Sequence, residues 1–466
     1  MSLLSALATT STALQVFSTA LGADQTNVSN SATPGFASVR AVIRPITDTI
    51  TVSDGNTVSG SDTVQIQSSS NSYADAAVQA ASSQASNSQV SANSLTPVNQ
   101  AFDITGASGI LAAFQSFSSA FSGLSVSPGD PTLQATAIAA AGAVANAFRS
   151  AAATLDSQST SISSQIETTV GSINDLSSQI RQYNVALRGK SSADPATDAS
   201  LRSALDQLST LTDITVTKNH DGTVNVLTGG QQPLVLGDQA YGLQANLSAP
   251  PENQITSTGG GSSPGQYSGQ LGALLQVRNG ALQTLLGGNG VTGSLNQLAL
   301  GFASRVNAVL SGGVTSSGGQ GLPIFNYDAN SASNVARTLA TDSAVTPATL
   351  AVATGGVSAQ SNGVANQLAA LPSSAAASDQ IAGQSAENFF ASIATGIGQQ
   401  LSDARSQAST DAAALTSAQS ARQQVSGVSL DTEAVSITSY QRAYEASARL
   451  VSILDQLTSD EVNLIK

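Results

Sequence analysis

Two interleaved seven-residue series in the middle of the chain constrain its fold more than any other feature. The first comprises Leu155, Ile162, Thr169, Leu176 and Tyr183, and the second, offset by four residues, comprises Ile166, Ile173, Ile180 and Leu187. This spacing aligns one face of a helix over about four to five heptads, as in coiled coils. The sequence therefore predicts a long helix that packs against other helices.

More helices are expected after this one. A break at residues 189–195 precedes Leu201, Leu205 and Leu208, which share one face of a shorter helix. Helices joined by a short loop fold back on one another. Apolar periodicity predicts further helices at about 271–286, 295–310 and 378–422.

The periodicity changes between residues 214 and 250. Apolar residues alternate with polar ones on both sides of Asp221-Gly222, a dipeptide typical of hairpin turns. Residues 234–236 and 241–247 are candidates for further strands, so a small β subdomain is expected here. Residues 251–268 are rich in Gly, Ser and Pro and are expected to form a flexible connector.

The two ends of the chain each carry an amphipathic helix. In the first, Leu3, Leu7, Leu14, Phe17, Leu21 and Val28 occupy heptad core positions, with Thr10 and Asp24 in the remaining ones. This helix is expected to end before Thr33-Pro34-Gly35, because proline does not continue a helix. The last helix carries a stripe of Leu430, Ala434, Ile437, Tyr444, Ala448, Val451, Leu454 and Leu457. Asp431 and Glu433 lie in its first turn, where the helix dipole favours negative charge.

These patterns predict a mainly α fold whose terminal helices pair as a coiled coil. The expected domains are a terminal coiled coil (1–36 and 428–466), a bundle of long helices (37–213, 251–310 and 377–427), the β subdomain (214–250) and a Gly, Ser and Ala-rich reduced outer region (311–376). Burial of apolar residues on a single terminal helix does not offset the entropic cost of ordering that helix, which is about 1 to 2 kcal/mol per residue. We expect it to fold when it packs on a partner.

Composition excludes several classes of function. The chain has no Cys and one His, so disulfides, thiol nucleophiles and zinc fingers are excluded. Its net charge of −13 disfavours binding to nucleic acid or to membrane surfaces. The first basic residue is Arg40, which argues against a Sec-type secretion signal, and no uninterrupted apolar run approaches the roughly 18 residues of a membrane span.

Candidate chemistry is sparse. Residues 288–293 match G-x-G-x-x-G, but no strand pattern precedes them and no acidic residue follows at the required distance. His220 falls at the tip of the predicted hairpin, where a solvated turn residue is the better interpretation. We therefore expect no enzyme activity and no catalytic, cofactor-binding or metal-binding residues.

Short motifs at both ends resemble those of a known family. Residues 27–36 (NVSNSATPGF), 426–433 (SGVSLDTE) and 440–450 (YQRAYEASARL) are similar to signatures of bacterial flagellar rod, hook and hook-associated axial proteins. Thr26 and Phe36 depart from the usual Asn and Tyr. Residues 194–208, the following hairpin and residues 295–325 resemble the family of hook-associated proteins at the junction between hook and filament. Larger relatives carry an additional β domain after this segment, which implies that the outer region is reduced here.

The resemblance implies a structural junction protein that assembles on the distal end of the hook and connects it to the filament through the next hook-associated protein. Implied partners are copies of the same chain in a ring, hook protein, the second junction protein and an export chaperone on the last helix. The implied location is outside the cell, at the hook-filament junction, after type III export. The expected contact residues are Leu3, Leu7, Leu14, Phe17, Leu21, Val28, Leu430, Ile437, Tyr440, Tyr444, Ala448, Val451, Leu454 and Leu457. Asn27, Asn30, Pro34 and Gly35 are expected to shape the bend after the first helix.

Three alternatives remain open. The chain is another axial protein, such as the second junction protein or hook protein, although the heptads at 155–187 argue against the mainly β body of hook protein. It is a secreted hydrolase or effector that uses the same export motifs, with residues 214–350 as the active insert. It is a free-living adhesin.

Overall fold

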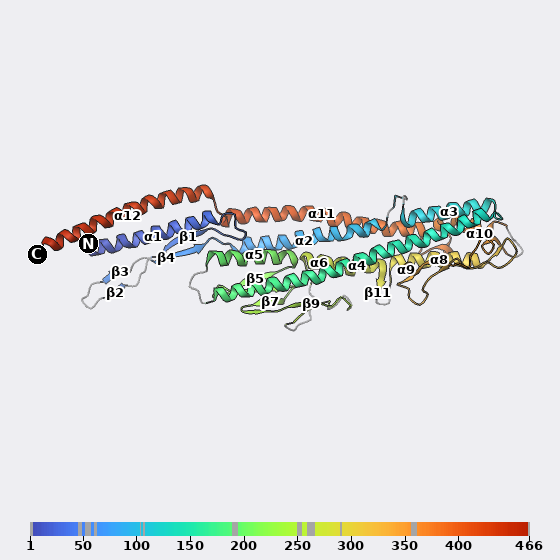
Figure 1. Cartoon of the computed structure of the whole chain (residues 1–466), viewed down its shortest axis with the longest axis horizontal. Coiled ribbons are helices and arrows are strands. Elements are labelled where there is room, and N and C mark those ends of the chain that lie inside the picture. Colours follow the sequence, from blue (N-terminus) through green and yellow to red (C-terminus); the bar gives the residue numbers. More distant parts are fainter. Residues whose placement is uncertain are drawn as a thin grey trace.

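A computed structural model describes residues 3–44, 49–51, 57–59, 63–102, 104–105, 108–188, 194–248, 254–258, 266–288, 291–355 and 361–464. The molecule is a long rod, and both chain ends lie at the same end of it (Figure 1). That arrangement follows from α1 (Leu3–Ser29) and α12 (Leu430–Leu464), which run antiparallel beside each other. The predicted pairing of the terminal helices is confirmed.

A β ribbon lies along α1, where the sequence was expected to begin a helical bundle. Strand β1 (Val39–Arg44) pairs antiparallel with β4 (Thr63–Ser68), and β1 also packs on α1. Two shorter strands, β2 (Thr49–Thr51) and β3 (Thr57–Ser59), pair beyond them. The expectation of a bundle from residue 37 onward was wrong, because alternating β-branched residues such as Val39, Val64 and Ile66 favour strands.

Five long helices form the body of the rod. They are α2 (Ser72–Gln100), α3 (Gly109–Val126), α4 (Pro131–Leu187), α5 (Pro195–Leu211) and α11 (Ala386–Ser426). Helix α4 spans 57 residues and buries the predicted heptad stripe, including Leu155, Ile162 and Ile173. Its start is fixed by Asp130, whose carboxylate accepts from the Thr132 amide, and by proline in the first turn.

The predicted β subdomain is confirmed. Strands β5 (Thr215–Lys218), β6 (Val224–Thr228), β7 (Gln232–Leu236) and β8 (Gln239–Ala240) form one antiparallel sheet in chain order. Gly222 turns the first hairpin with a φ of +84°. Strand β9 (Leu243–Ala245) pairs with β10 (Ile255–Ser257), so part of the expected connector forms a strand. The buried Asn184 of α4 bonds the backbone of Val224 and Gly237, which attaches the sheet to the body.

The helix predicted at 271–286 is divided into three pieces. They are α6 (Gly269–Gln276), the π-helix η1 (Val277–Leu282) and α7 (Gln283–Leu286), after which β11 (Gly287–Gly288) and β12 (Val291–Thr292) lead to α8 (Ser294–Ser311). Residues 311–376 form short elements: β13 (Gly313–Thr315), β14 (Phe325–Asn326), α9 (Val335–Thr338), β15 (Ala340–Thr341), β16 (Ala351–Thr354), α10 (Gly363–Ala370) and the 3₁₀ turn η2 (Leu371–Ser373), with η3 (Ala377–Asp379) just beyond. Buried Ile324, Leu339 and Leu350 join this region to the core.

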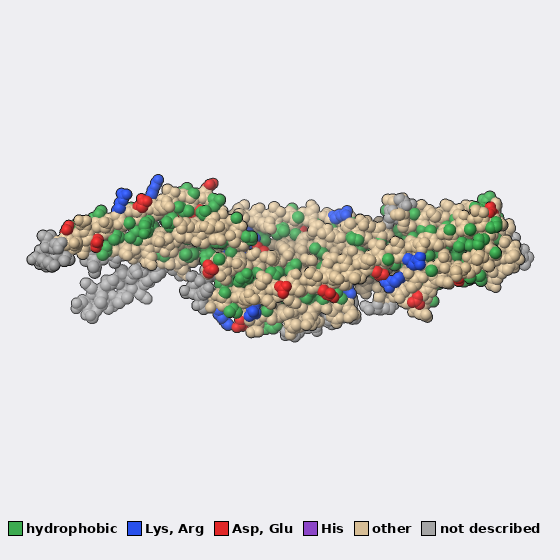
Figure 2. Space-filling view, in the orientation of Figure 1, with side chains coloured by type: hydrophobic (Ala, Val, Ile, Leu, Met, Phe, Trp, Pro, Cys, Tyr) green, Lys and Arg blue, Asp and Glu red, His purple; other side chains and the backbone are tan. Residues whose placement is uncertain are grey.

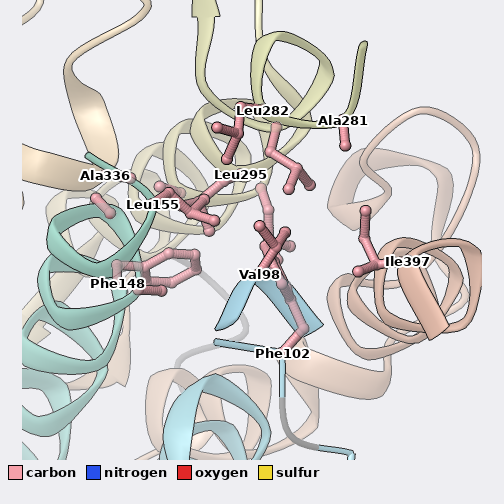
Figure 3. Packing of buried hydrophobic residues seen from close by; sticks show 14 of the residues in the cluster. Val98, Phe102, Phe148, Leu155, Ala281, Leu282, Leu295, Ala336 and Ile397 are labelled. Carbon is pink, nitrogen blue, oxygen red and sulfur yellow. The ribbon is translucent and has the colours of Figure 1, made fainter. Parts of the chain in front are cut away.

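The core of the body is rich in fully buried phenylalanine. Phe302 of α8 contacts Phe114 and Phe117 of α3, with ring centroids 4.7 and 5.3 Å apart. Phe148 of α4 joins the same cluster, with its ring centroid 6.0 Å from that of Phe114, and Leu155 of α4 lies near Leu295 of α8 (Figure 3). Each such side chain stabilises the body by about 1.5 to 3 kcal/mol on burial. The body therefore has a hydrophobic core of its own, separate from the terminal pair.

Two described helices, α3 and α4, are long and apolar enough to cross a membrane by length and composition alone. Phe114, Phe117 and Phe121 of α3 are, however, fully buried among neighbouring helices. Core helices of folded domains have the same composition. The apolar character of α3 and α4 is therefore explained by packing within the body.

Candidate assembly site

The terminal helix pair is held together by a narrow stripe on α12. Tyr440 lies against Phe17 of α1, with ring centroids 6.4 Å apart. Ile437, Val451 and Leu454 are half-buried on the same stripe, as predicted. The expected contact between the two helices is therefore present within a single chain.

On α1, the buried face differs from the predicted one. The residues buried there are Thr10, Val16, Ala20, Ala23, Asp24 and Asn27. The predicted large apolar residues Leu7, Leu14, Phe17 and Leu21 are only half-buried, Val28 is exposed, and the side chain of Leu3 lies outside the described residues. The reason is that α1 packs against both α12 and β1, so the face between these two partners is enclosed.

Part of the predicted stripe on α12 faces outward. Leu430, Tyr444, Ala448 and Leu457 are exposed in the single chain, so their expected role as contact residues stays a prediction. Val435, Leu450 and Ile453 are also exposed, with Val435 71% exposed. Figure 2 shows hydrophobic side chains gathered over this end of the rod. Val435, Leu450, Ile453 and Leu457 share one face of α12 at 3.6 residues per turn, and we call these four residues the outer stripe of α12.

Asn27 joins three segments at the end of the helix pair. It is 1% exposed, and its Nδ2 donates to the Val39 carbonyl at 2.9 Å and to Glu433 Oε2 at 3.0 Å. Its Oδ1 accepts from the Val39 amide at 2.7 Å. One side chain therefore ties α1 to both β1 and α12.

Asp24 lies one turn before Asn27 and faces the same Glu433. It is 8% exposed, and its Oδ2 has no hydrogen-bond partner. Burial, together with the charge of Glu433 and a hydrogen bond to it, raises the pKa of Asp24 to about 6. The end of the helix pair thus holds two carboxyl groups in contact.

The bend after α1 is fixed to the body at Gly35. Gly35 has a φ of +75°, and a Cβ there would lie 2.4 Å from the Ala199 carbonyl oxygen of α5. The Gly35 carbonyl accepts from Arg202 at 2.7 Å, and Arg202 also pairs with Asp198. Asn30 closes the end of α1 by donating to the Thr26 carbonyl, whereas Pro34 is exposed at the turn.

A second arginine fixes the other connecting segment. Arg422, near the end of α11, contacts Asp206 of α5 at 2.8 Å and Asp75 of α2 at 3.6 Å. Burial raises the pKa of Asp75 and of Asp206, while Arg202 and Arg422 act in the opposite direction. Together with Gly35 and Arg202, these residues form what we call the joint, which encloses a cavity of about 270 Å³.

Serines complete the joint. The Ser38 amide donates to the Ser426 carbonyl at 2.9 Å, and the Ser69 amide donates to the Ser38 carbonyl at 2.8 Å. The Ser426 hydroxyl donates to the Ser69 carbonyl at 3.1 Å. Three segments that are distant in sequence are therefore bonded in one ring.

Sequence reasoning missed the arginines of the joint. The carboxylate partners of Arg422 lie on α2 and α5, and Arg202 donates to the carbonyl of Gly35, which is 167 residues away in sequence. No local pattern in the sequence indicates these contacts. His220 is exposed in the turn between β5 and β6, and residues 289–290 of the glycine motif lie outside the described residues. Across the described ranges, no cluster of His, Cys, Asp or Glu is suited to a metal ion.

Comparison with known proteins gives a consistent result. The family model for the "Flagellar hook-associated protein FlgK helical domain" matches residues 95–325, and that for the "Flagellar basal body rod FlgEFG protein C-terminal" matches residues 419–464. Flagellar hook-associated protein 1 of Bacillus subtilis (strain 168) is 25% identical over 403 residues, which are 80% of this chain and 79% of that protein. Together these matches show that the chain is similar to flagellar hook-associated protein 1 over most of its length.

A solved member of the family shares the fold. The flagellar hook junction protein FlgK of Burkholderia pseudomallei superposes with a TM-score of 0.64, at 16% identity, over 75% of this chain and 100% of that one. The family models support the resemblance in the middle of the chain and at its C-terminal end. The second model covers the whole of α12.

Proposed function

We propose that this chain is a structural junction protein of the bacterial flagellum, which assembles on the distal end of the hook and connects it to the filament through the next hook-associated protein. The observation that carries the proposal is the terminal pair of α1 and α12, which lies at one end of the rod and exposes an apolar stripe. Exposed apolar patches of this kind mark surfaces that pack against other proteins.

The proposal also names the partners of the chain. In this proposal, copies of the chain form a ring in which the outer stripe of α12 and the half-buried residues of α1 line the inner wall. The hook protein lies on one side of the ring and the second junction protein on the other. Before assembly, an export chaperone covers the last helix, and the protein reaches its place outside the cell by type III export.

The chain acts in this proposal as a subunit and not as an enzyme. Residues 214–350, the insert considered as a catalytic region, begin with the β subdomain, which is bonded to α4 through Asn184 and serves as part of the wall of the rod. The low charge of the surface suits a subunit that packs among many copies of itself.

Deletion of the gene tests the proposal most directly. Electron microscopy of the deletion strain should show bare hooks, and an immunoblot of the medium should detect unpolymerised flagellin. Restoring the full gene should restore filaments. Full-length filaments in the deletion strain would discard the junction role, and loss of the hooks as well would indicate an earlier axial protein.

The chaperone contact needs a separate test. The full chain should copurify with a chaperone from the cytosol, and a chain that lacks residues 428–466 should not. Copurification that survives this deletion would contradict the proposed binding to the last helix.

A further inference from the structure

The contact between Asp24 and Glu433 brings two acidic side chains together. Asn27 is the neighbouring side chain that donates a hydrogen bond to one of them, Glu433. Asn27 donates to Glu433 Oε2, but its only other donated bond goes to the Val39 carbonyl. Asp24 is 8% exposed and its Oδ2 has no partner. Ionised carboxylates only accept hydrogen bonds, so the pair is unsatisfied when both groups are charged.

Among the side chains that the structure describes, no charged group on the surrounding elements neutralises the pair; the side chain of Arg44 on β1 lies outside them. On β1, Val39 is buried toward α1, and residues alternate along a strand, so the exposed Arg40 points away. Strand β4 (Thr63–Ser68) contains no charged residue, and Asp24 is the one charged residue of α1. On α12, Asp431 is exposed and adds a second negative charge in the same turn as Glu433.

We propose that Asp24 and Glu433 share a proton and thereby act as a pH-sensitive clamp between α1 and α12. A proton on the pair turns one carboxyl into a donor, and the resulting hydrogen bond joins the two helices. When the proton leaves, two like charges remain at a buried contact. The terminal pair therefore closes more firmly in acidic than in alkaline surroundings.

The size of the effect follows from linkage. The pKa of Asp24 rises from 3.8 to about 6 when the pair is formed, so the paired state holds its proton more tightly than the separated state. The stability that this proton supplies is present in acid and is lost as the pH rises through about 6. With these two pKa values, the equilibrium constant for the pairing of α1 with α12 should fall about tenfold between pH 5 and pH 8.

Hydrogen exchange of the full-length protein measures this equilibrium, even when the open state is rare. Protection factors for amides of α1 near Asp24, corrected for the intrinsic effect of pH, should be about tenfold higher at pH 5 than at pH 8. In Asp24→Asn the carboxamide is neutral and keeps a donor, so protection should be high and nearly independent of pH. Amides of the buried heptads of α4 serve as the internal reference.

Asp431→Asn is the matched control, because it removes an exposed acid from the same turn of α12 as Glu433. It should retain the pH response. Glu433→Gln should weaken the response, because burial alone then raises the pKa of Asp24. All three variants keep His220, so its titration is common to every sample. Equal protection at both pH values in the unmodified protein, or an unchanged response in Asp24→Asn, would overturn the proposal.

Discussion

Asn27 on α1 donates a 3.0 Å hydrogen bond to Glu433 on α12, although 406 residues separate the two in sequence. The same amide also serves both backbone groups of Val39. The two ends of the chain are therefore connected by one buried side chain at the point where they enter the body. The predictions about assembly depend on this connection, because it attaches the terminal helix pair to the body of the rod.

Replacing Asn27 should weaken the terminal pair selectively. Asn27→Ala leaves the Val39 amide and carbonyl unpaired, and each buried group without a partner costs about 1 to 3 kcal/mol. Hydrogen exchange should show faster exchange in α1 and β1 and unchanged exchange in α4. Asn30→Ala, which loses only local bonds to Thr26 and Thr33, should have a smaller effect. Equal effects of the two substitutions would contradict the connecting role of Asn27.

Gly35 should not tolerate a side chain. Gly35→Ala places a Cβ against the Ala199 carbonyl and forces a left-handed conformation, which together should cost at least about 2 kcal/mol. Thermal unfolding should show a lower midpoint for the joint, and incorporation at the hook tip should fall. Gly22→Ala is the matched control, since a Cβ at Gly22 meets no atom within 4 Å and alanine favours a helix. If Gly35→Ala left the unfolding midpoint unchanged, the bend would not be fixed at this contact.

Ile453 on the outer stripe of α12 should matter for assembly and not for folding. Ile453 is 57% exposed, so Ile453→Asp should change the free energy of unfolding by less than about 0.5 kcal/mol. The same variant should fail to incorporate into flagella when expressed in the deletion strain. Ile453→Met keeps the apolar surface and should restore filaments. Normal filaments with Ile453→Asp would remove the outer stripe from the proposed assembly surface.

Leu14 and Val451 test the pairing of the helices themselves. Both are half-buried, so Leu14→Asp or Val451→Asp should open the terminal pair, block incorporation and leave the body folded. Circular dichroism and hydrogen exchange of α4 report on the body, and electron microscopy reports on incorporation. Normal incorporation of both variants would contradict the role of the pair.

The ion pairs of Arg422 should make the joint dependent on pH. Arg422→Met removes the cation beside Asp75 and Asp206 and should cost about 1 to 2 kcal/mol at pH 7.5. Burial already raises the pKa of both acids, and loss of Arg422 raises it further, so the folded state gains affinity for protons. The cost should therefore shrink as the pH falls toward 5.

Thermal unfolding at the two pH values checks this dependence on Arg422. Arg188→Met is the control, because its pair with Asp238 is largely exposed and should be worth less than about 0.5 kcal/mol. A penalty for Arg422→Met that does not change with pH would show that the acids stay ionised without their partner.

Much of the body was predictable from the sequence because its determinants are local. The heptads around Leu155 and Ile173 set one face of α4, and Asp221-Gly222 sets the turn between β5 and β6. The ribbon of β1 and β4 was missed, since two six-residue strands separated by a loop give a weak pattern beside long helices. The family motifs located Asn27 and Gly35 without showing what either residue contacts.

The sequence by itself determined that helices at the two ends are amphipathic and that they pair. Only the tertiary structure decided which face of each is enclosed, because α1 lies between α12 and β1, and periodicity identifies an apolar face without identifying its neighbours. It also decided that Asp24, a polar residue in a heptad core position, meets Glu433 and not solvent. Contacts across hundreds of residues depend on the packing of the whole rod, and no local pattern specifies them.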